Sequence, residues 1–139
     1  MTKLYVKETS NLEEVKKVIF DPEIYERIRV EGVEVKELPV DNTTYIAGYV
    51  DGEIIAVMVY YRRKNYTTCH PHVLANCRGK YGVKFVRESF KLRPRDILYT
   101  NISPRFPEVI KFAEYFGFKY IGQLSNKDKL YGVNYGFCS

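Results

Sequence analysis

The sequence predicts an α/β fold with a mixed, mostly antiparallel central sheet and helices on both of its faces. Three observations lead to this fold class. The hydrophobic patterns follow the order β-α-α-β-β-β-α-β-α-β-β. An Asp51-Gly52 pair joins two apolar runs as an antiparallel hairpin, and a later strand–helix–strand run indicates a right-handed parallel crossover. Because the 139 residues are 45% hydrophobic and contain no linker-like stretch, we expect one domain over residues 1–139.

The first third of the chain predicts one strand and two helices. Ser10 and Glu13 have the spacing of a capping box, which marks the start of a helix. Asp21 is a suitable N-cap, and Pro22 suits the first position of a second helix. Gly32 is placed to end that helix. The predicted elements are a strand over residues 3–8, helices over 12–20 and 22–30, and a connecting loop over 33–43.

The middle of the chain predicts a three-stranded antiparallel meander followed by a helix. The strand after the hairpin turn is almost entirely apolar, as expected of a strand buried on both faces. Pro94 ends the helix. The predicted strands cover residues 43–50, 53–61 and 66–74, and the helix covers 83–92. The apolar face of this helix comprises Val83, Val86, Ser89 and Phe90.

The last third predicts a strand, a second amphipathic helix and a final hairpin. Gly117 is positioned to end the helix in a left-handed conformation. The predicted strands cover residues 96–102, 118–124 and 129–137, and the helix covers 106–116. One face of this helix carries Val109, Phe112, Ala113 and Phe116.

The charge balance favours anionic ligands without indicating a nucleic-acid-binding protein. Lysine and arginine total 22 against 17 acidic residues, which gives a formal charge of +5. These charges are spread evenly, as on an ordinary solvated surface. No apolar run approaches the roughly 20 residues that cross a bilayer, and the first residues carry no secretory signal. We therefore expect a cytoplasmic protein without membrane contact, whose three cysteines are free thiols.

The segment TCHPHVLANCRGKYG, from Thr68 to Gly82, contains an apparent cluster of metal ligands. Its candidate ligands are Cys69, His70, His72 and Cys77. Adjacent residues of a strand point to opposite faces, so Cys69 and His70 diverge. The chain has no further histidine to complete a second ligand pair. We therefore expect no metal, and the alternative is a packed cysteine beside partly buried histidines.

The second half of the same segment indicates a cradle for phosphate. A glycine-containing stretch between a strand and a helix exposes unpaired backbone N–H groups at the positive end of the helix dipole. Arg78 and Lys80 add positive charge there. The glycine spacing matches neither a P-loop nor a dinucleotide-binding turn. A solvated helix start remains the alternative.

Two motifs resemble the GNAT family of acyl-CoA-dependent N-acyltransferases. VLANCRGKYG is similar to the family pattern Val-x-Pro-x-x-Arg-Gly-Lys-Gly-x-Gly, although Ala75 replaces the proline, Tyr81 and Val83 replace glycines, and Gly82 is shifted by one position. FAEYFGF resembles the end of the family's last helix. The resemblance spans almost the whole chain, and HPHVLANCRGKY is similar to compact GNATs of phage genomes, which implies the host cytoplasm as location for such a member.

The resemblance implies acetyl-CoA or another acyl-CoA as the acyl donor. The Val73 backbone would pair with pantetheine, and residues 77–83 would hold the pyrophosphate. The implied cofactor-binding residues are Val73, Leu74, Ala75, Cys77, Arg78, Gly79, Lys80, Tyr81, Gly82 and Val83. The acceptor would be an amine of a small molecule or of a protein lysine or N-terminus, selected by residues 20–40 and 125–131. The chain would act as a monomer or homodimer.

The catalytic groups are open between several residues. A group that titrates near pH 7 suits removal of the amine proton, so His72 and His70 are candidates for the base. The family's general-acid tyrosine aligns with Ala113, so Tyr99 or Ser103 would have to supply the acid. The alternative for these residues is ordinary packing or solvent exposure. A GNAT-fold binding or assembly protein without catalysis is therefore the second hypothesis.

Overall fold

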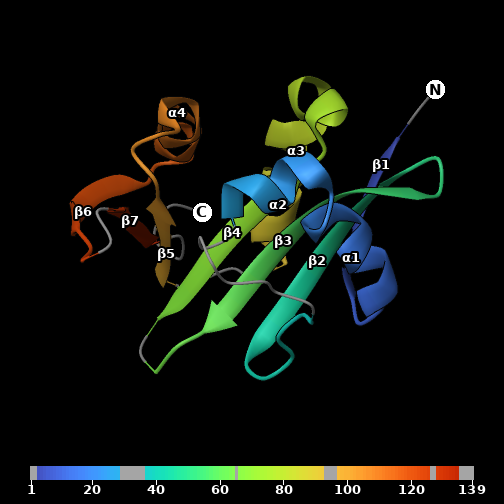
Figure 1. The fold of residues 1–139 in the computed structure, drawn as a ribbon, viewed down its shortest axis with the longest axis horizontal. Helices are drawn as coiled ribbons and strands as arrows, with labels where there is room; N and C mark the ends of the chain where they lie inside the picture. The colour runs from blue at the N-terminus through green and yellow to red at the C-terminus, as the bar shows by residue number, and fades with distance from the viewer. Residues whose placement is uncertain (1–2, 29–36, 65, 93–96, 126–127, 135–139) are drawn as a thin grey trace. The chain divides into compact units, whose positions relative to one another are not determined.

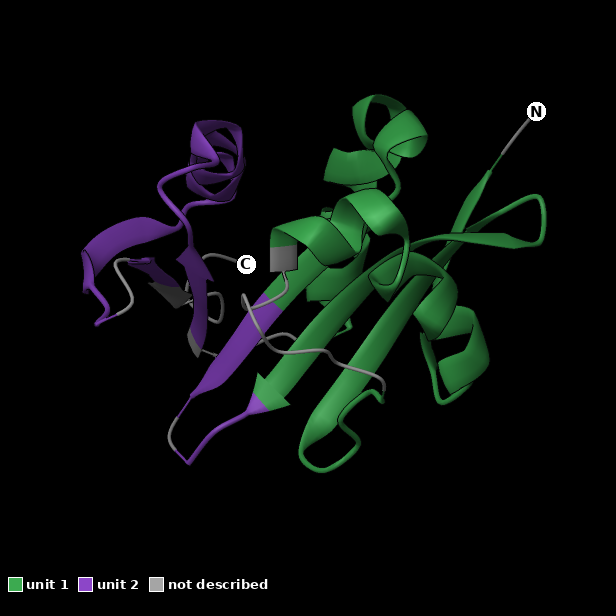
Figure 2. Ribbon diagram, in the orientation of Figure 1, with its two compact units in different colours: residues 1–61, 70–93 green, residues 62–69, 94–139 purple. Residues whose placement is uncertain are grey.

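The computed structural model describes residues 3–28, 37–64, 66–92, 97–125 and 128–134 (Figure 1). Its elements are β1 (Leu4–Thr9), α1 (Leu12–Ile19), α2 (Pro22–Ile28), β2 (Thr43–Val50), β3 (Glu53–Arg62), β4 (Thr67–Val73), a 3₁₀ turn η1 (Ala75–Cys77), α3 (Arg78–Lys91), β5 (Ile97–Ile102), α4 (Pro107–Tyr115), β6 (Lys119–Gln123) and β7 (Lys129–Asn134). This order confirms the predicted one. The chain forms two compact units, residues 1–61 with 70–93 and residues 62–69 with 94–139, hereafter unit 1 and unit 2 (Figure 2).

The seven strands are hydrogen-bonded in the order β1-β2-β3-β4-β5-β7-β6, and the sheet is mostly antiparallel. The β2–β3 hairpin turns at Asp51 and Gly52, whose φ angles are 53° and 80°. Positive φ at both central residues is the geometry that an Asp-Gly pair favours in a two-residue hairpin. The parallel pair predicted by the crossover is β4 with β5, where Thr67 faces Leu98 and Thr68 faces Tyr99.

Helices α1 and α2 cover one face of the sheet in unit 1. Val15, Val18 and Ile19 of α1 and Ile24 of α2 are buried. They pack against side chains of β2 and β3, which alternate along β2 and step across an irregularity in the β2–β3 pairing between Ile54 and Ala56 of β3. The strand residues of this cluster are Tyr45, Ala47, Tyr49, Ile54, Val57 and Val59. The predicted fold class has helices on both faces of the sheet, so α3 is expected on the face opposite α1 and α2.

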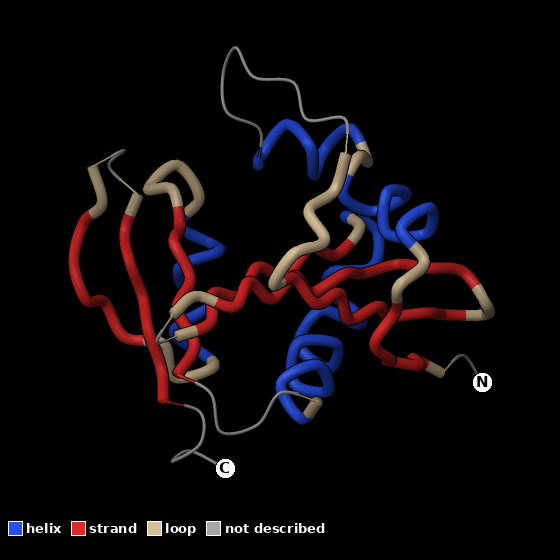
Figure 3. The backbone as a smooth tube through the Cα atoms, turned by 90° about the horizontal axis from the view of Figure 1, so that it is seen from below, coloured by secondary structure: helices blue, strands red, loops and turns tan. Residues whose placement is uncertain are grey.

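Helix α3 packs on the opposite face of unit 1, as the edge-on view of its strands shows (Figure 3). A Cβ built on Gly48 of β2 would lie 2.7 Å from the Phe85 ring, so the glycine permits this close packing. The Tyr60 hydroxyl donates to the Ser89 carbonyl at 3.2 Å. The expected apolar face is wrong at one position, since Val83 is exposed and Phe85 is fully buried.

Two helix starts differ from the predicted ones. Asn11, not Ser10, caps α1, and its side-chain oxygen accepts from the Glu14 N–H at 3.3 Å. The prediction failed because Asn11 and Glu14 have the same spacing as Ser10 and Glu13. Helix α3 begins at Arg78, five residues before the predicted start. The predicted end of α2 near Gly32 lies outside the described residues.

Unit 2 contains β5, β6, β7 and α4. Strand β7 pairs antiparallel with β5 on one side and with β6 on the other. Ala113 of α4 and Phe118 are buried, while Val109, Phe112 and Phe116 are half-buried. The predicted apolar face of this helix is therefore the one that turns inward. The predicted continuation of the last strand over 135–137 lies outside the described residues.

Candidate functional site

The side chains of β4 alternate between a buried and a half-buried face. Cys69 and Val73 are buried, and His70 and His72 are half-buried. The His70 ring meets the Tyr61 ring edge to face, with 6.2 Å between centroids. Burial raises the pKa of the Cys69 thiol to about 12, so this thiol stays protonated and unreactive. The strand therefore separates Cys69 from the two histidines.

The His72 imidazole is held in its neutral form. Desolvation is the main cause that lowers its pKa to about 3, and repulsion from His70 and Arg78 acts in the same direction. A base with so low a pKa accepts a proton weakly at neutral pH. His72 therefore suits hydrogen bonding to a substrate or a water molecule better than proton removal.

The backbone at the end of β4 presents hydrogen-bonding groups at the strand edge opposite β3. The Leu74 N–H donates to the Ile55 carbonyl of β3 at 2.9 Å. Because neighbouring residues of a strand direct their backbone groups to opposite edges, those of Val73 and Pro71 point to the other edge. Proline has no N–H, so Pro71 offers a carbonyl and Val73 offers an N–H there. This pair suits an extended ligand that presents the N–H of one amide and the carbonyl of the next amide on the same side.

Helix α3 starts immediately after this strand end, through the short η1 turn. The Cys77 N–H donates to the Leu74 carbonyl at 2.9 Å, and no side chain caps the first N–H groups of α3. The first turn of α3 contains no acidic residue. Gly79 is exposed, and a Cβ built on it would meet no atom within 4 Å. The first-turn amides therefore form an approachable anion site with the positive end of the helix dipole.

The other residues of the predicted phosphate site differ in exposure. Gly82 is buried, and Tyr81 is half-buried with the Lys80 ammonium 5.3 Å from its ring centre. Cys77 is half-buried, and its thiol lies 3.5 Å from the Asn76 side-chain oxygen. Tyr81 belongs to the helix rather than to a loop. The glycines of the family pattern are therefore replaced within a regular helix, where any residue can adopt the backbone conformation.

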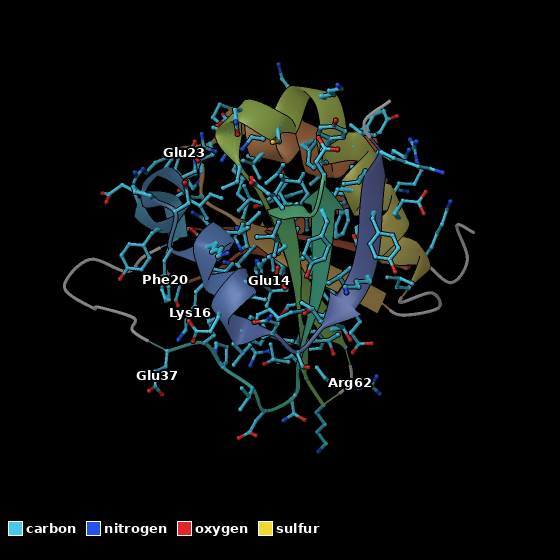
Figure 4. All side chains as sticks on the ribbon, turned by 90° about the vertical axis from the view of Figure 1, so that its right-hand side faces the viewer. Glu14, Lys16, Phe20, Glu23, Glu37 and Arg62 are labelled. Carbon is cyan, nitrogen blue, oxygen red and sulfur yellow. The ribbon has the colours of Figure 1, made fainter. Side chains whose placement is uncertain are left out.

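Arg78 makes contacts that the sequence does not reveal. Its Nη1 donates to Glu23 Oε2 at 2.7 Å, its Nη2 donates to Glu23 Oε1, and its Nε donates to the Val73 carbonyl at 2.9 Å. Figure 4 shows Glu23 on α2. The Arg78 guanidinium is the main cause that holds the Glu23 pKa below its usual range. Sequence analysis missed Glu23 because 55 residues separate it from Arg78 and no local spacing links them.

The two candidates for the acid belong to unit 2. Tyr99 lies edge to face with Tyr66, with 4.9 Å between ring centroids. The Ser103 hydroxyl accepts from the Arg105 N–H at 3.3 Å in the turn before α4. Ala113 is buried, and its carbonyl accepts from Phe116 and Phe118 at the end of α4. His70, His72 and the residues 73–83 all belong to unit 1.

The fold of the chain matches solved acyltransferase structures. One is a Klebsiella pneumoniae protein whose name assigns it to the acyl-CoA N-acyltransferases, with 11% identity, TM-score 0.73, and coverage of 95% of this chain and 97% of that one. An acetyltransferase of the GNAT family from Staphylococcus aureus Mu50 is 15% identical with a TM-score of 0.68, and the match covers 95% of this chain and 99% of that one. A variant of the spermidine N-acetyltransferase SpeG from Vibrio cholerae is 10% identical with a TM-score of 0.71, and the match covers 94% of this chain and 92% of that one. The chain has the GNAT fold.

The GNAT fold agrees with the resemblance of the two sequence motifs. No protein-family model and no curated protein sequence matches the chain. In the part of the chain that the structure describes, no three His, Cys, Asp or Glu side chains gather in a group suited to a metal ion. No helix among the described residues is long and apolar enough to cross a membrane.

Proposed function

We propose that the protein transfers an acyl group, in the first instance acetyl, from acyl-CoA directly to an amine. The observation that carries this proposal is the junction of β4 with α3 in a GNAT fold. The strand edge at Pro71 and Val73 offers an acceptor to the N–H of one pantetheine amide and a donor to the carbonyl of the other. A few residues later, the first turn of α3 at Gly79, which no N-cap side chain covers, offers amide donors to the diphosphate.

The reaction needs one base and one route for the leaving thiolate. The amine nitrogen attacks the thioester carbonyl carbon and gives up a proton to the base. Negative charge develops on the carbonyl oxygen, and the C–S bond then breaks to release the CoA thiolate, which takes up a proton. Of the two histidines, His70 is our candidate for the base. His72, neutral over the whole physiological range, is our candidate for holding a bridging water molecule.

Tyr99 and Ser103 remain our candidates for the group that protonates the thiolate. Tyr99 has its ring packed against Tyr66, and the Ser103 hydroxyl accepts a hydrogen bond in a turn. Thiolate is a comparatively good leaving group, so a modest donor is enough. Residues 20–40 and 125–131 remain the proposed acceptor-selecting segments. The proposal includes a single domain in the cytoplasm, of the host for a phage-encoded protein, as monomer or homodimer.

Thermal unfolding with acetyl-CoA, followed by a release assay for free CoA, tests the proposal. A ligand present at 100 times its Kd stabilises the folded state by about 2.7 kcal/mol, which raises the Tm by several degrees. Acetyl-CoA should therefore raise the Tm, and an amine panel should include an acceptor that releases CoA faster than water does. An unchanged Tm at millimolar acetyl-CoA excludes the donor site.

Ala113 supports a second candidate, a binding or assembly protein that retains the acyl-CoA site without catalysis. A buried alanine stands where the resemblance places the hydroxyl of the general acid. This candidate predicts the same rise in Tm with acetyl-CoA but no CoA release with any amine. The two measurements together therefore separate the enzyme, the inactive binder and a chain without an acyl-CoA site.

A further inference from the structure

The Arg78 guanidinium joins three elements of unit 1. Glu23 lies in the first turn of α2, Val73 ends β4, and Arg78 begins α3. The bidentate fork to Glu23 and the bond from Nε to the Val73 carbonyl orient the guanidinium in one plane. The side chains of Arg78 and Glu23 are 35% and 40% exposed, so the pair is only partly open to solvent.

We propose that Glu23 and Arg78 are positioning residues for acyl-CoA, whose ion pair fixes the end of β4 and the start of α3 in the arrangement that receives the donor. This inference rests on the proposed function and deepens it. It assigns a role to Glu23, a residue outside the acyl-CoA motif. It also changes the role of Arg78, which would act through the backbone of its neighbours rather than as a phosphate ligand.

The contacts of Arg78 favour positioning over direct phosphate binding. Its positive charge is balanced by the Glu23 carboxylate, which a second cation, Arg27, also approaches with 3.4 Å between Nε and Oε2. The lowered pKa of Glu23 keeps this carboxylate ionised at neutral pH. A diphosphate would have to compete with a bidentate carboxylate for the same fork. The N-cap residue Cys77 places no side-chain hydrogen bond on the first turn of α3.

The bond from Arg78 to Val73 has a direct consequence for the strand edge. The Val73 carbonyl and N–H point to the same edge of β4 because Leu74 is the residue that bonds to β3. Holding the carbonyl at 2.9 Å from Arg78 Nε therefore favours the extended conformation of Val73, in which its N–H points to the same edge. This N–H is the donor proposed for pantetheine. One side chain thus aligns the strand edge and the helix start.

Hydrogen–deuterium exchange on the ligand-free protein tests the positioning role independently of acyl-CoA binding. Glu23→Gln removes the charge of the carboxylate, and Arg78→Lys keeps the cation but loses the fork and the Nε donor. Glu88→Gln is the matched control, since Glu88 pairs with Lys91 on the exposed side of the same helix. The Leu74 N–H should exchange faster in both variants than in wild type and the control. Unchanged exchange overturns the inference.

Binding of two donor fragments separates positioning from phosphate binding. S-acetylpantetheine lacks the diphosphate, and 3′-phosphoadenosine 5′-diphosphate lacks the pantetheine. Positioning predicts that Glu23→Gln and Arg78→Lys each weaken S-acetylpantetheine and acetyl-CoA by about tenfold, the worth of one charge-assisted hydrogen bond. Direct phosphate binding predicts the opposite pattern. Glu23→Gln would then tighten the nucleotide fragment, and S-acetylpantetheine would be unaffected.

Ligand binding by the wild-type protein distinguishes failure of the proposed function from failure of the positioning role. If wild type binds neither acetyl-CoA nor S-acetylpantetheine, the proposed function fails while the exchange result still reports on the ion pair. If wild type binds both and the variants bind equally well, the proposed function stands and the positioning role is overturned. The circular dichroism and Tm of each variant are recorded, so that a loss of binding is compared only between folded proteins.

Discussion

At the scale of single residues, the two histidines of β4 have different surroundings. Both lie on the half-buried face of the strand. Desolvation keeps the His72 imidazole neutral, and the ring of His70 rests against Tyr61. Strand alternation made this shared face predictable from sequence. The lowered pKa of His72 was not predictable, because it depends on which groups surround the ring.

The lowered pKa of His72 makes stability depend on pH. Between its folded value of about 3 and its ordinary value of 6.5, the unfolded chain binds a proton that the folded chain does not. The free energy of unfolding therefore falls as the pH drops through this window, and the full stability is present above pH 6.5. His72→Gln should reduce the loss of stability between pH 7 and pH 4 by about 1–3 kcal/mol.

Urea unfolding of wild type and His72→Gln at both pH values measures this difference. Glu23, whose lowered pKa also makes acid destabilising, titrates in both proteins and cancels in the comparison. An NMR titration of the imidazole is the direct check. A His72 pKa near 6.5 in the folded protein would contradict the prediction, as would equal pH dependence of the two proteins.

The ion pair of Glu23 with Arg78 shows where sequence reasoning stops at this scale. The sequence marks Arg78 as a cation beside a helix start, which favours a phosphate ligand. Its partner is fixed by tertiary structure, because α2 packs over the sheet close to the start of α3. For Cys69, by contrast, the sequence is sufficient. Strand alternation alone removes it from the apparent metal-ligand cluster, and its burial agrees.

At the scale of elements, the start of α3 determines what the RGKYG segment can do. The sequence suggested a loop before a helix beginning at Val83, because glycines commonly interrupt helices. The structure continues the helix back to Arg78. Gly82 lies on the buried face together with Phe85 and Val86, at the three-to-four-residue spacing of a helix. The period of the core-facing residues was therefore the stronger signal.

Gly79 allows the role of the helix start to be tested. A Cβ at this exposed position meets no atom within 4 Å, so Gly79→Ala should stabilise the protein by up to about 1 kcal/mol through helix propensity. Gly79→Leu should fold equally well but weaken acetyl-CoA binding by about tenfold or more, because its side chain obstructs a diphosphate approaching the first-turn amides. Calorimetric titration and thermal unfolding measure the two effects.

A matched control is available in unit 2. Gly122 of β6 is also a glycine at which an added Cβ meets no atom within 4 Å. Gly122→Leu should leave acetyl-CoA affinity unchanged. Wild-type affinity in Gly79→Leu would show that the diphosphate does not use the start of α3, and it would remove the support for the proposed donor site.

Short-range signals predicted the elements better than their ends. The Asp51-Gly52 turn, the apolar β3 strand and the order of elements follow from local chemistry. Local chemistry alone does not identify the N-cap of α1, because Ser10 and Asn11 are both good N-caps with a glutamate three residues later. The choice between them is made by packing, which buries Val15, Val18 and Ile19 against the sheet.

At the scale of the whole molecule, the backbone passes three times between the two compact units. The polypeptide passes between the units at residues 61–62, 69–70 and 93–94. The second of these passages lies inside β4, whose first residues pair with β5 in unit 2. This connectivity supports the proposal that residues 1–139 form a single domain.

A single domain should unfold in one cooperative transition. The chain contains no tryptophan, so one introduced tryptophan reports on one unit without background. Phe20→Trp places the reporter beside the α1 core of unit 1, and Phe116→Trp places it on the half-buried face of α4 in unit 2. Urea midpoints from both reporters and from far-ultraviolet circular dichroism should coincide, with an m value of about 1–3 kcal/mol/M. Two separate midpoints would instead identify the units as independently folding domains, because each reporter would then follow the unfolding of its own unit.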